Sequence, residues 1–152
     1  MADCFTKTKR SAVMKAVKSC NNKSTELALV KIFRKLKMHG WARHSLLPGN
    51  PDFVFKKRRI AIFVDGCFWH GHFCRTGIPQ NNRQFWRKKI IGNMKRDKTS
   101  TKLLQKMGWQ TLRIWECSLT NKKLFTFLRI LSKAISHSSK LSIETLYNFA
   151  RR

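Results

Sequence analysis

Acidic residues are scarce in this chain of 152 residues: seven Asp and Glu stand against 33 Lys and Arg, a formal net charge of +26. Such a charge opposes compaction through self-repulsion and suits a polyanionic partner. Nucleic acid is the first candidate partner, and an anionic membrane surface is the second. Hydrophobic residues make up 42% of the chain and include five Trp and eleven Phe, which argues against a disordered basic tail.

Long apolar runs are also missing. No stretch approaches the roughly 18 residues of a membrane-spanning helix, and the basic start MADCFTKTKR lacks the apolar segment of a signal peptide. The five cysteines are an odd number. Together these features predict a reducing, cytoplasmic location, where clustered Cys and His more often bind metal than form disulfides.

The few acids are informative through their placement. A phosphate-binding chain gains nothing from carboxylates on its binding face unless they hold a cation or take part in chemistry. The alternative for any one of them is a helix cap or a pair with lysine. The seven are Asp3, Glu26, Asp52, Asp65, Asp97, Glu116 and Glu144.

The pattern of apolar residues predicts the first long helix and a hairpin. ELALVKIFRKLKMHG has helical spacing, with Ser24 or Thr25 as the cap and Gly40 as the stop. A strand then starts at Asp52, and the buried strand IAIFVD returns after a polar turn. Because hairpin strands are antiparallel, Asp52 and Asp65 should lie on the same side of the sheet.

The second half of the chain predicts a crossover. NNRQFWRKKIIGNMKRDKTSTKLLQKMG fits one long helix, or two helices interrupted near Gly92, closed by Gly108. WQTLRIWEC follows as the third strand, and KKLFTFLRILSKAI as an amphipathic helix. The apolar stripe expected on the long helix consists of Phe85, Ile90, Met94, Leu104 and Met107.

These elements follow the order α-β-β-β-α-β-α, with a weak strand near Trp41, and predict a single three-layer α/β domain. We expect a basic helical arm over about residues 1–22, a core over about 23–135 and a tail over about 136–152. There is no internal repeat and no low-complexity linker.

A metal site is the first interpretation of FVDGCFWHGHFC. Cys67, His72 and Cys74 have the spacing C-x4-H-x-C, and Cys117 follows the third strand. Three ligands from one loop and a fourth from a neighbouring strand end would complete a tetrahedral Cys3His zinc site. The alternative is a set of buried cysteines that only pack.

The hairpin itself resembles another pattern. NPDF at the start of one strand and FVDG at the end of the next resemble the PD-(D/E)xK nuclease layout, in which a divalent cation neutralises charge and activates water. The usual Glu-x-Lys is absent from the return strand, where Phe63, Val64 and Asp65 stand instead.

The departure points to one family. LPGNPDFVF, FVDGCFWHGHFC, NRQFWRKKIIGNMKRD and GWQTLRIWEC, in this order and spacing, resemble the very short patch repair (Vsr) DNA mismatch endonucleases, from about Arg10 to Cys117. That resemblance implies a PD-(D/E)xK restriction-endonuclease-like fold with a structural zinc. The family's activity would be magnesium-dependent nicking 5′ to the thymine of T:G mismatches left by deaminated 5-methylcytosine.

The resemblance also implies residue roles. Asp52 and the Val64 carbonyl would bind magnesium, His70 would be the general base, Asp97 would orient metal-bound water and Glu26 would support His70. Asp65 would bind or support the metal. The zinc ligands would be Cys67, His72, Cys74 and Cys117. The side chains that enter the DNA stack would be Phe68, Trp69, Trp86 and Met14.

Two other classes remain open. A PD-(D/E)xK endonuclease of restriction-type specificity would share the catalytic set, and a zinc-stapled basic nucleic-acid-binding protein would explain the charge and the cysteines without catalysis. The expected partner is double-stranded DNA with a T:G mismatch, bound by a monomer at the bacterial nucleoid. General mismatch-repair proteins are a further partner class that the sequence does not identify.

Overall fold

The computed structural model describes residues 8, 22, 24–74, 77–120 and 122–135. Their elements are α2 (Glu26–Lys35), β1 (Phe53–Phe55), η1 (Lys56–Arg58), β2 (Ile60–Asp65), α3 (Arg83–Lys106), β3 (Gln110–Trp115), η2 (Glu116–Thr120) and α4 (Lys122–Ile135). The predicted N-terminal arm with Met14, and the predicted tail, lie outside these residues. No helix in the described ranges has the length and hydropathy to cross a bilayer.

The sheet has the order β1-β2-β3. β1 and β2 pair antiparallel, with Phe53 opposite Ile62, so the predicted hairpin is confirmed. β3 pairs parallel with β2, and α3 makes the crossover. All six residues of β2 are buried, as expected of a central strand. The weak strand predicted near Trp41 is reduced to one bridge between Ala42 and Val54.

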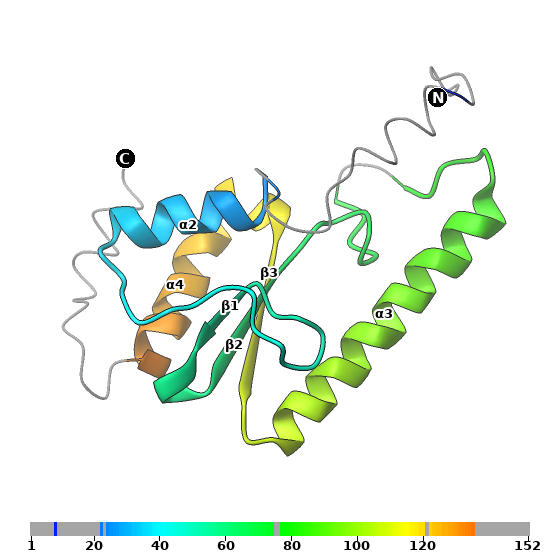
Figure 1. Cartoon of the computed structure of the whole chain (residues 1–152). Helices are drawn as coiled ribbons and strands as arrows, with labels where there is room; N and C mark the ends of the chain where they lie inside the picture. Colours follow the sequence, from blue (N-terminus) through cyan, green and yellow to red (C-terminus); the bar gives the residue numbers. More distant parts are fainter. Residues whose placement is uncertain (1–7, 9–21, 23, 75–76, 121, 136–152) are drawn as a thin grey trace.

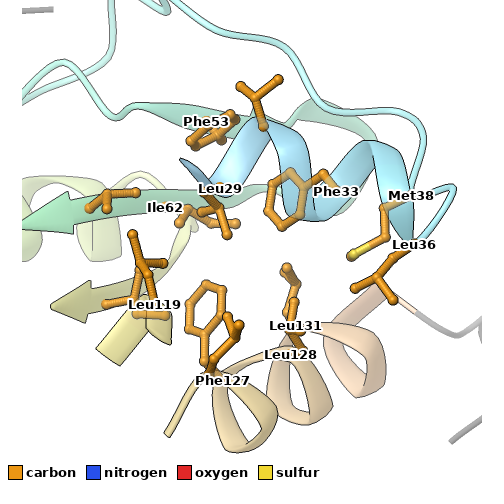
Figure 2. Packing of buried hydrophobic residues seen from close by; sticks show 14 of the residues in the cluster. Leu29, Phe33, Leu36, Met38, Phe53, Ile62, Leu119, Phe127, Leu128 and Leu131 are labelled. Carbon is orange, nitrogen blue, oxygen red and sulfur yellow. The ribbon is translucent and has the colours of Figure 1, made fainter. Parts of the chain in front are cut away.

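Helices cover both faces of the sheet (Figure 1). α2 and α4 lie on one face and α3 on the other, which gives three layers. The larger core lies between α2, α4 and the sheet. Figure 2 shows how its side chains interlock there: Leu29, Phe33, Leu36, Met38, Phe53, Ile62, Leu119, Phe127, Leu128 and Leu131. The helical pattern read from the sequence therefore marks the core face of α2 and α4.

The core under α3 is small. It consists of Val54, Ala61, Phe63 and Leu104. Three of the residues predicted for the buried stripe are exposed: Phe85 by 58%, Met94 by 39% and Met107 by 47%. That prediction was wrong for them because α3 packs on the sheet only near Leu104, while its first half lies beside the loop that follows β2.

The helix ends differ in part from the prediction. α3 runs unbroken through Gly92 and closes at Gly108, whose φ of +75° fits the predicted glycine stop. Neither predicted cap forms: Thr25 makes no side-chain cap bond at the start of α2, and the Ser24 hydroxyl and N–H bond to the Asn22 side chain. α2 also ends before Gly40, because Lys37 already takes a left-handed φ of +50°.

Gly49 tests how closely the loop before β1 packs on the rest of the fold. Its φ is +80°, and an added Cβ would lie 2.7 Å from the Ser100 Cβ of α3. Gly40 has a similar φ of +83° with nothing within 4 Å, so it is a matched control. We expect Gly40→Ala to cost about 1–2 kcal/mol from backbone strain, and Gly49→Ala to cost about 1–3 kcal/mol more from overpacking. Urea unfolding measures both, and equal costs would contradict the tight loop–helix contact.

Candidate active site and metal cluster

Four of the seven acids meet in one cavity of about 580 Å³ at the end of the β1–β2 hairpin. They come from four different parts of the chain: the start of α2, the residue before β1, the end of β2 and the middle of α3. The acids are Glu26, Asp52, Asp65 and Asp97, and His70 lines the same cavity. The prediction that Asp52 and Asp65 lie on one side of the sheet is therefore confirmed.

Asp52 is held by the neighbouring strand. Its Oδ2 accepts a hydrogen bond from the Val64 N–H at 2.7 Å. Extending the register of β1 and β2 places Pro51 opposite Val64. In antiparallel strands every second residue pair exchanges two hydrogen bonds, but Pro51 has no N–H, so it cannot donate to the Val64 carbonyl. The Pro-Asp dipeptide thus puts a carboxylate against the backbone of Val64 without adding an N–H that could occupy the Val64 carbonyl.

The protonation of Asp52 reflects this environment. The pKa of Asp52 is raised from 3.8 to about 6, chiefly because the carboxyl group is buried. The hydrogen bond from the Val64 N–H has the opposite, smaller effect on this pKa. The negative charges of Glu26 and Asp65 raise the pKa further, and Arg43 opposes them. Several carboxylates near one another favour either a proton or a cation at this position.

His70 is oriented by Asp97. Its Nδ1 lies 2.6 Å from Asp97 Oδ2 and 3.9 Å from Asp65 Oδ1. An imidazole that donates from Nδ1 keeps its lone pair on Nε2. The arrangement therefore suits His70 to accept a proton from a water molecule at Nε2, while Asp97 holds the ring.

The other two acids have arginine partners. Both oxygens of Asp65 contact Arg113 Nη1, at 2.8 and 2.7 Å. Glu26 forms a close ion pair with Arg43. Asp97 is the acid in contact with His70, and Glu26 lines the same cavity, so support of His70 by Glu26 stays a prediction.

The loop that carries His70 is fixed to α3. Asn93 Nδ2 donates to the Trp69 carbonyl at 2.7 Å. Gly71 has a φ of +76°, and a Cβ there would lie only 2.8 Å from Met94 Sδ, so the backbone approaches the helix closely. These contacts position His70 over the cavity.

The four predicted metal ligands converge. The ligand atoms of Cys67, His72, Cys74 and Cys117 all lie within 4.8 Å of one another. Cys117 reaches the loop from η2, directly after β3, and its Sγ lies 3.6 Å from His72 Nδ1. The His72 ring stacks on Trp115 at 4.6 Å between centroids. Three thiols and one imidazole nitrogen make a donor set that suits a tetrahedral metal.

The aromatic residues form a cluster beside the cavity. Ring centroids of Phe68 lie 5.3 Å from Trp69 and 5.4 Å from Trp86, and Lys89 Nζ lies 5.3 Å from the Trp69 ring. Trp86 is only 9% exposed, whereas Phe68 and Trp69 are half-buried. Trp86 therefore belongs to the packed part of the cluster, and Phe68 and Trp69 to its accessible part.

Sequence reasoning missed the residues that hold the acids and the loop: Arg43, Lys89, Asn93 and Arg113. A signal existed for Arg113. It is the one charged residue within the β3 segment QTLRIW, and a charge in a strand that borders the central strand needs a counter-charge. No comparable signal marks Asn93, because its partner is a backbone carbonyl.

Comparison with known proteins shows the family of this chain. The family model described as DNA mismatch endonuclease Vsr matches residues 2–76. The chain is 35% identical over 127 residues to the DNA mismatch endonuclease Vsr of Escherichia coli, covering 83% of this chain and 81% of that protein. It is 37% identical over 126 residues to the type II nicking enzyme V.NmeAIP of Neisseria meningitidis serogroup A, covering 82% and 89% respectively. It is 36% identical over 125 residues to the type II nicking enzyme V.XorIIP of Xanthomonas oryzae, covering 80% and 89%.

The strong positive charge, the α/β fold and these relatives define the protein as a DNA endonuclease, a hydrolase. More narrowly, it belongs to the family of Vsr DNA mismatch endonucleases. The resemblance read from its motifs is thereby confirmed.

The raised pKa of Asp52 makes a prediction about stability. A carboxyl group with a folded pKa of about 6 and an ordinary value of 3.8 binds protons more tightly when folded. Its contribution to stability is therefore present below about pH 4 and is lost as the pH rises through about 6, a loss of about 3 kcal/mol. Asp52→Asn removes this penalty and keeps an oxygen for the Val64 N–H.

In magnesium-free buffer we expect Asp52→Asn to be more stable than the parent at about pH 7.5, with the difference shrinking towards about pH 5. Urea unfolding of both proteins at the two pH values measures it. A difference that does not change with pH would contradict the raised pKa.

Proposed function

We propose that this protein nicks one strand of duplex DNA 5′ to the thymine of a T:G mismatch that arises from deaminated 5-methylcytosine, with magnesium as its catalytic metal. One observation carries the proposal: in a chain of charge +26, four of only seven acids share a cavity with His70. A surface that binds phosphates has no use for carboxylates there unless they hold a cation or move a proton.

Asp52 and the Val64 carbonyl are the residues that would hold magnesium. Hard oxygen donors suit this ion, and Asp52 is a buried carboxyl group whose pKa is raised by burial and by the neighbouring Glu26 and Asp65, charges that a cation would offset. When bound, magnesium would neutralise charge on the phosphate and activate water. Asp65 is a weaker candidate ligand, because both of its oxygens already contact Arg113.

His70 would act as the general base. Asp97 holds its Nδ1, which leaves Nε2 to take the proton of the attacking water. The family resemblance predicts that Asp97 orients metal-bound water. The 2.6 Å contact instead supports a role in orienting His70.

Zinc is the metal we propose for the Cys67, His72, Cys74 and Cys117 cluster, with a structural role. It would tie the His70 loop to the end of β3.

A PD-(D/E)xK-like core is the matching fold proposal, supported by the mixed three-stranded sheet and by Asp52 at the start of the hairpin. We further propose that a monomer acts on chromosomal DNA in the bacterial cytoplasm.

Mismatch recognition would rest on the aromatic cluster. A T:G wobble stacks less well than a normal pair, so inserting an apolar wedge costs least there. Phe68 and Trp69 are accessible beside the cavity, whereas the packed Trp86 would enter DNA only if the cluster opens. Met14, the fourth proposed wedge, lies outside the described residues.

A strand-labelled nicking assay tests the proposed reaction. With magnesium, we expect the T:G duplex to be nicked 5′ to the thymine, and T:A and C:G duplexes of the same sequence to stay intact. Asp52→Asn should abolish nicking while DNA binding remains, because a cationic face is not weakened by losing an acid. Nicking of all three duplexes would indicate another endonuclease specificity, and no nicking would overturn the proposal.

The metal cluster predicts a coupled loss of stability and activity. Cys74→Ser should reduce bound zinc from about one ion per chain and lower the melting temperature, because metal binding contributes to folding. Elemental analysis and thermal melting measure the two effects. Active, freshly purified protein without zinc would contradict the assignment.

If Phe68 and Trp69 insert into the mismatched step, removing their rings should weaken the enzyme's preference for T:G over T:A duplexes. Phe68→Ala and Trp69→Ala should reduce the ratio of T:G to T:A nicking more than they reduce melting temperature or non-specific binding, because their rings lie at the accessible side of the cluster. Phe73→Ala is the matched control: Phe73 belongs to the same loop and is 48% exposed. Discrimination that survives in both variants, or falls equally in the control, would count against the wedge.

A further inference from the structure

Arg113 lies at the centre of a charged network that neither the motifs nor the relatives assign. It projects from β3, where its Cα is paired with that of Phe63 on the neighbouring β2. Its guanidinium carbon lies 4.3 Å from the centroid of the Phe63 ring, a stacking contact that fixes the group in place.

Two acids flank this guanidinium. Nη1 contacts both oxygens of Asp65, at 2.8 and 2.7 Å. Nη2 lies 3.6 Å from Asp97 Oδ1, and the other oxygen of Asp97 is the one that holds His70. The network therefore connects β2, β3, α3 and the loop that carries His70, through the side chains of Asp65, Arg113, Asp97 and His70.

Burial makes Arg113 necessary for Asp65. Asp65 is 4% exposed, and its nearest oxygen is 3.9 Å from His70 Nδ1. A buried carboxylate without a counter-charge is costly. Without Arg113, Asp65 would compete with Asp97 for His70 Nδ1, and the ring would have two positions instead of one.

One donor of Arg113 is unused. Within the described residues, Nη2 is buried and has no hydrogen-bond partner, and Asp97 is just beyond hydrogen-bonding distance. Unsatisfied buried donors are rare and call for an explanation. The nearest acceptor is Asp97 Oδ1 at 3.6 Å, so Nη2 faces the carboxylate that holds His70 and acts on it through charge.

We propose that Arg113 is a positioning residue for the nicking reaction: it occupies Asp65 and steadies Asp97, so that His70 is held in one orientation and Asp65 does not serve as a magnesium ligand. This inference rests on the function proposed above. It gives Asp65 a role as the anchor of Arg113.

Single-turnover nicking of the T:G duplex tests the role. Arg113→Met should slow the step about 10–100-fold, the usual effect of losing a group that orients a catalytic residue. DNA affinity, measured without magnesium, should change no more than in Arg129→Met, which removes an exposed arginine from α4 on the opposite face of the sheet. Arg113→Lys should lie between, because lysine keeps the charge but lacks the planar fork.

The pair Asp65 and Arg113 supports a double-mutant cycle. Asp65→Asn with Arg113→Met leaves no unpaired carboxylate, so its rate should be no lower than that of Arg113→Met alone. Asp65→Asn should also keep the parent's half-saturating magnesium concentration, since Asp65 is not a ligand. If Arg113→Met does not fold, Arg113→Lys and the double variant, which both avoid an unpaired Asp65, decide the matter.

The inference is overturned if Arg113→Met nicks within about twofold of the parent, or if its slower nicking is explained by weaker DNA binding or a lower melting temperature alone. It is also overturned if the rate losses of Asp65→Asn and Arg113→Met multiply in the double variant. A much higher magnesium requirement in Asp65→Asn would overturn it as well. These outcomes all require a parent that nicks T:G. A parent that does not nick overturns the proposed function itself, so the two failures are distinct.

Discussion

The antiparallel register of β1 and β2 is the constraint on which the site depends. It places Asp52, the residue before β1, beside the last residues of β2, where the Val64 N–H donates to its carboxylate. Because side chains alternate along a strand, the same register turns Val64 towards the larger core and Asp65 towards α3. A shift by one residue would exchange these faces and separate the carboxylates. The site is thus a property of the strand pairing as much as of the residues.

Charge is balanced locally within a molecule that is strongly positive overall. Each acid of the cavity has a nearest partner that fixes its direction: a backbone N–H for Asp52, a histidine for Asp97, and an arginine each for Asp65 and Glu26. Burial raises the pKa of Asp52 to about 6, and its hydrogen bond comes from a backbone N–H. An added cation there would offset the cost of burying the carboxylate. The remaining surface is left to attract DNA through its excess of lysine and arginine.

Much of this arrangement could be predicted from the sequence. The apolar run IAIFVD, the Pro-Asp dipeptide and the Cys and His spacing determine the hairpin, the carboxylates and the metal cluster, because each depends on local patterns. The exposure of Phe85 and Met94 on α3 could not be predicted, since both have the helical spacing of a buried stripe but no sheet beneath them. The partner Arg43 could not be predicted because, in a chain with 33 basic residues, composition does not tell which ones lie against an acid. Arg113 could have been found, since it is the one charged residue of its strand.

The proposed reaction depends on a divalent cation bound at Asp52 and the Val64 carbonyl. Anomalous diffraction at the manganese edge, from crystals of the protein with a T:G duplex and Mn²⁺ in place of Mg²⁺, tests it directly. We predict a peak within coordination distance of the Asp52 carboxylate and the Val64 carbonyl oxygen, with Asp65 still bound to Arg113. A manganese peak on Asp65, or on the cysteine cluster with none at Asp52, would contradict a catalytic cation site at Asp52.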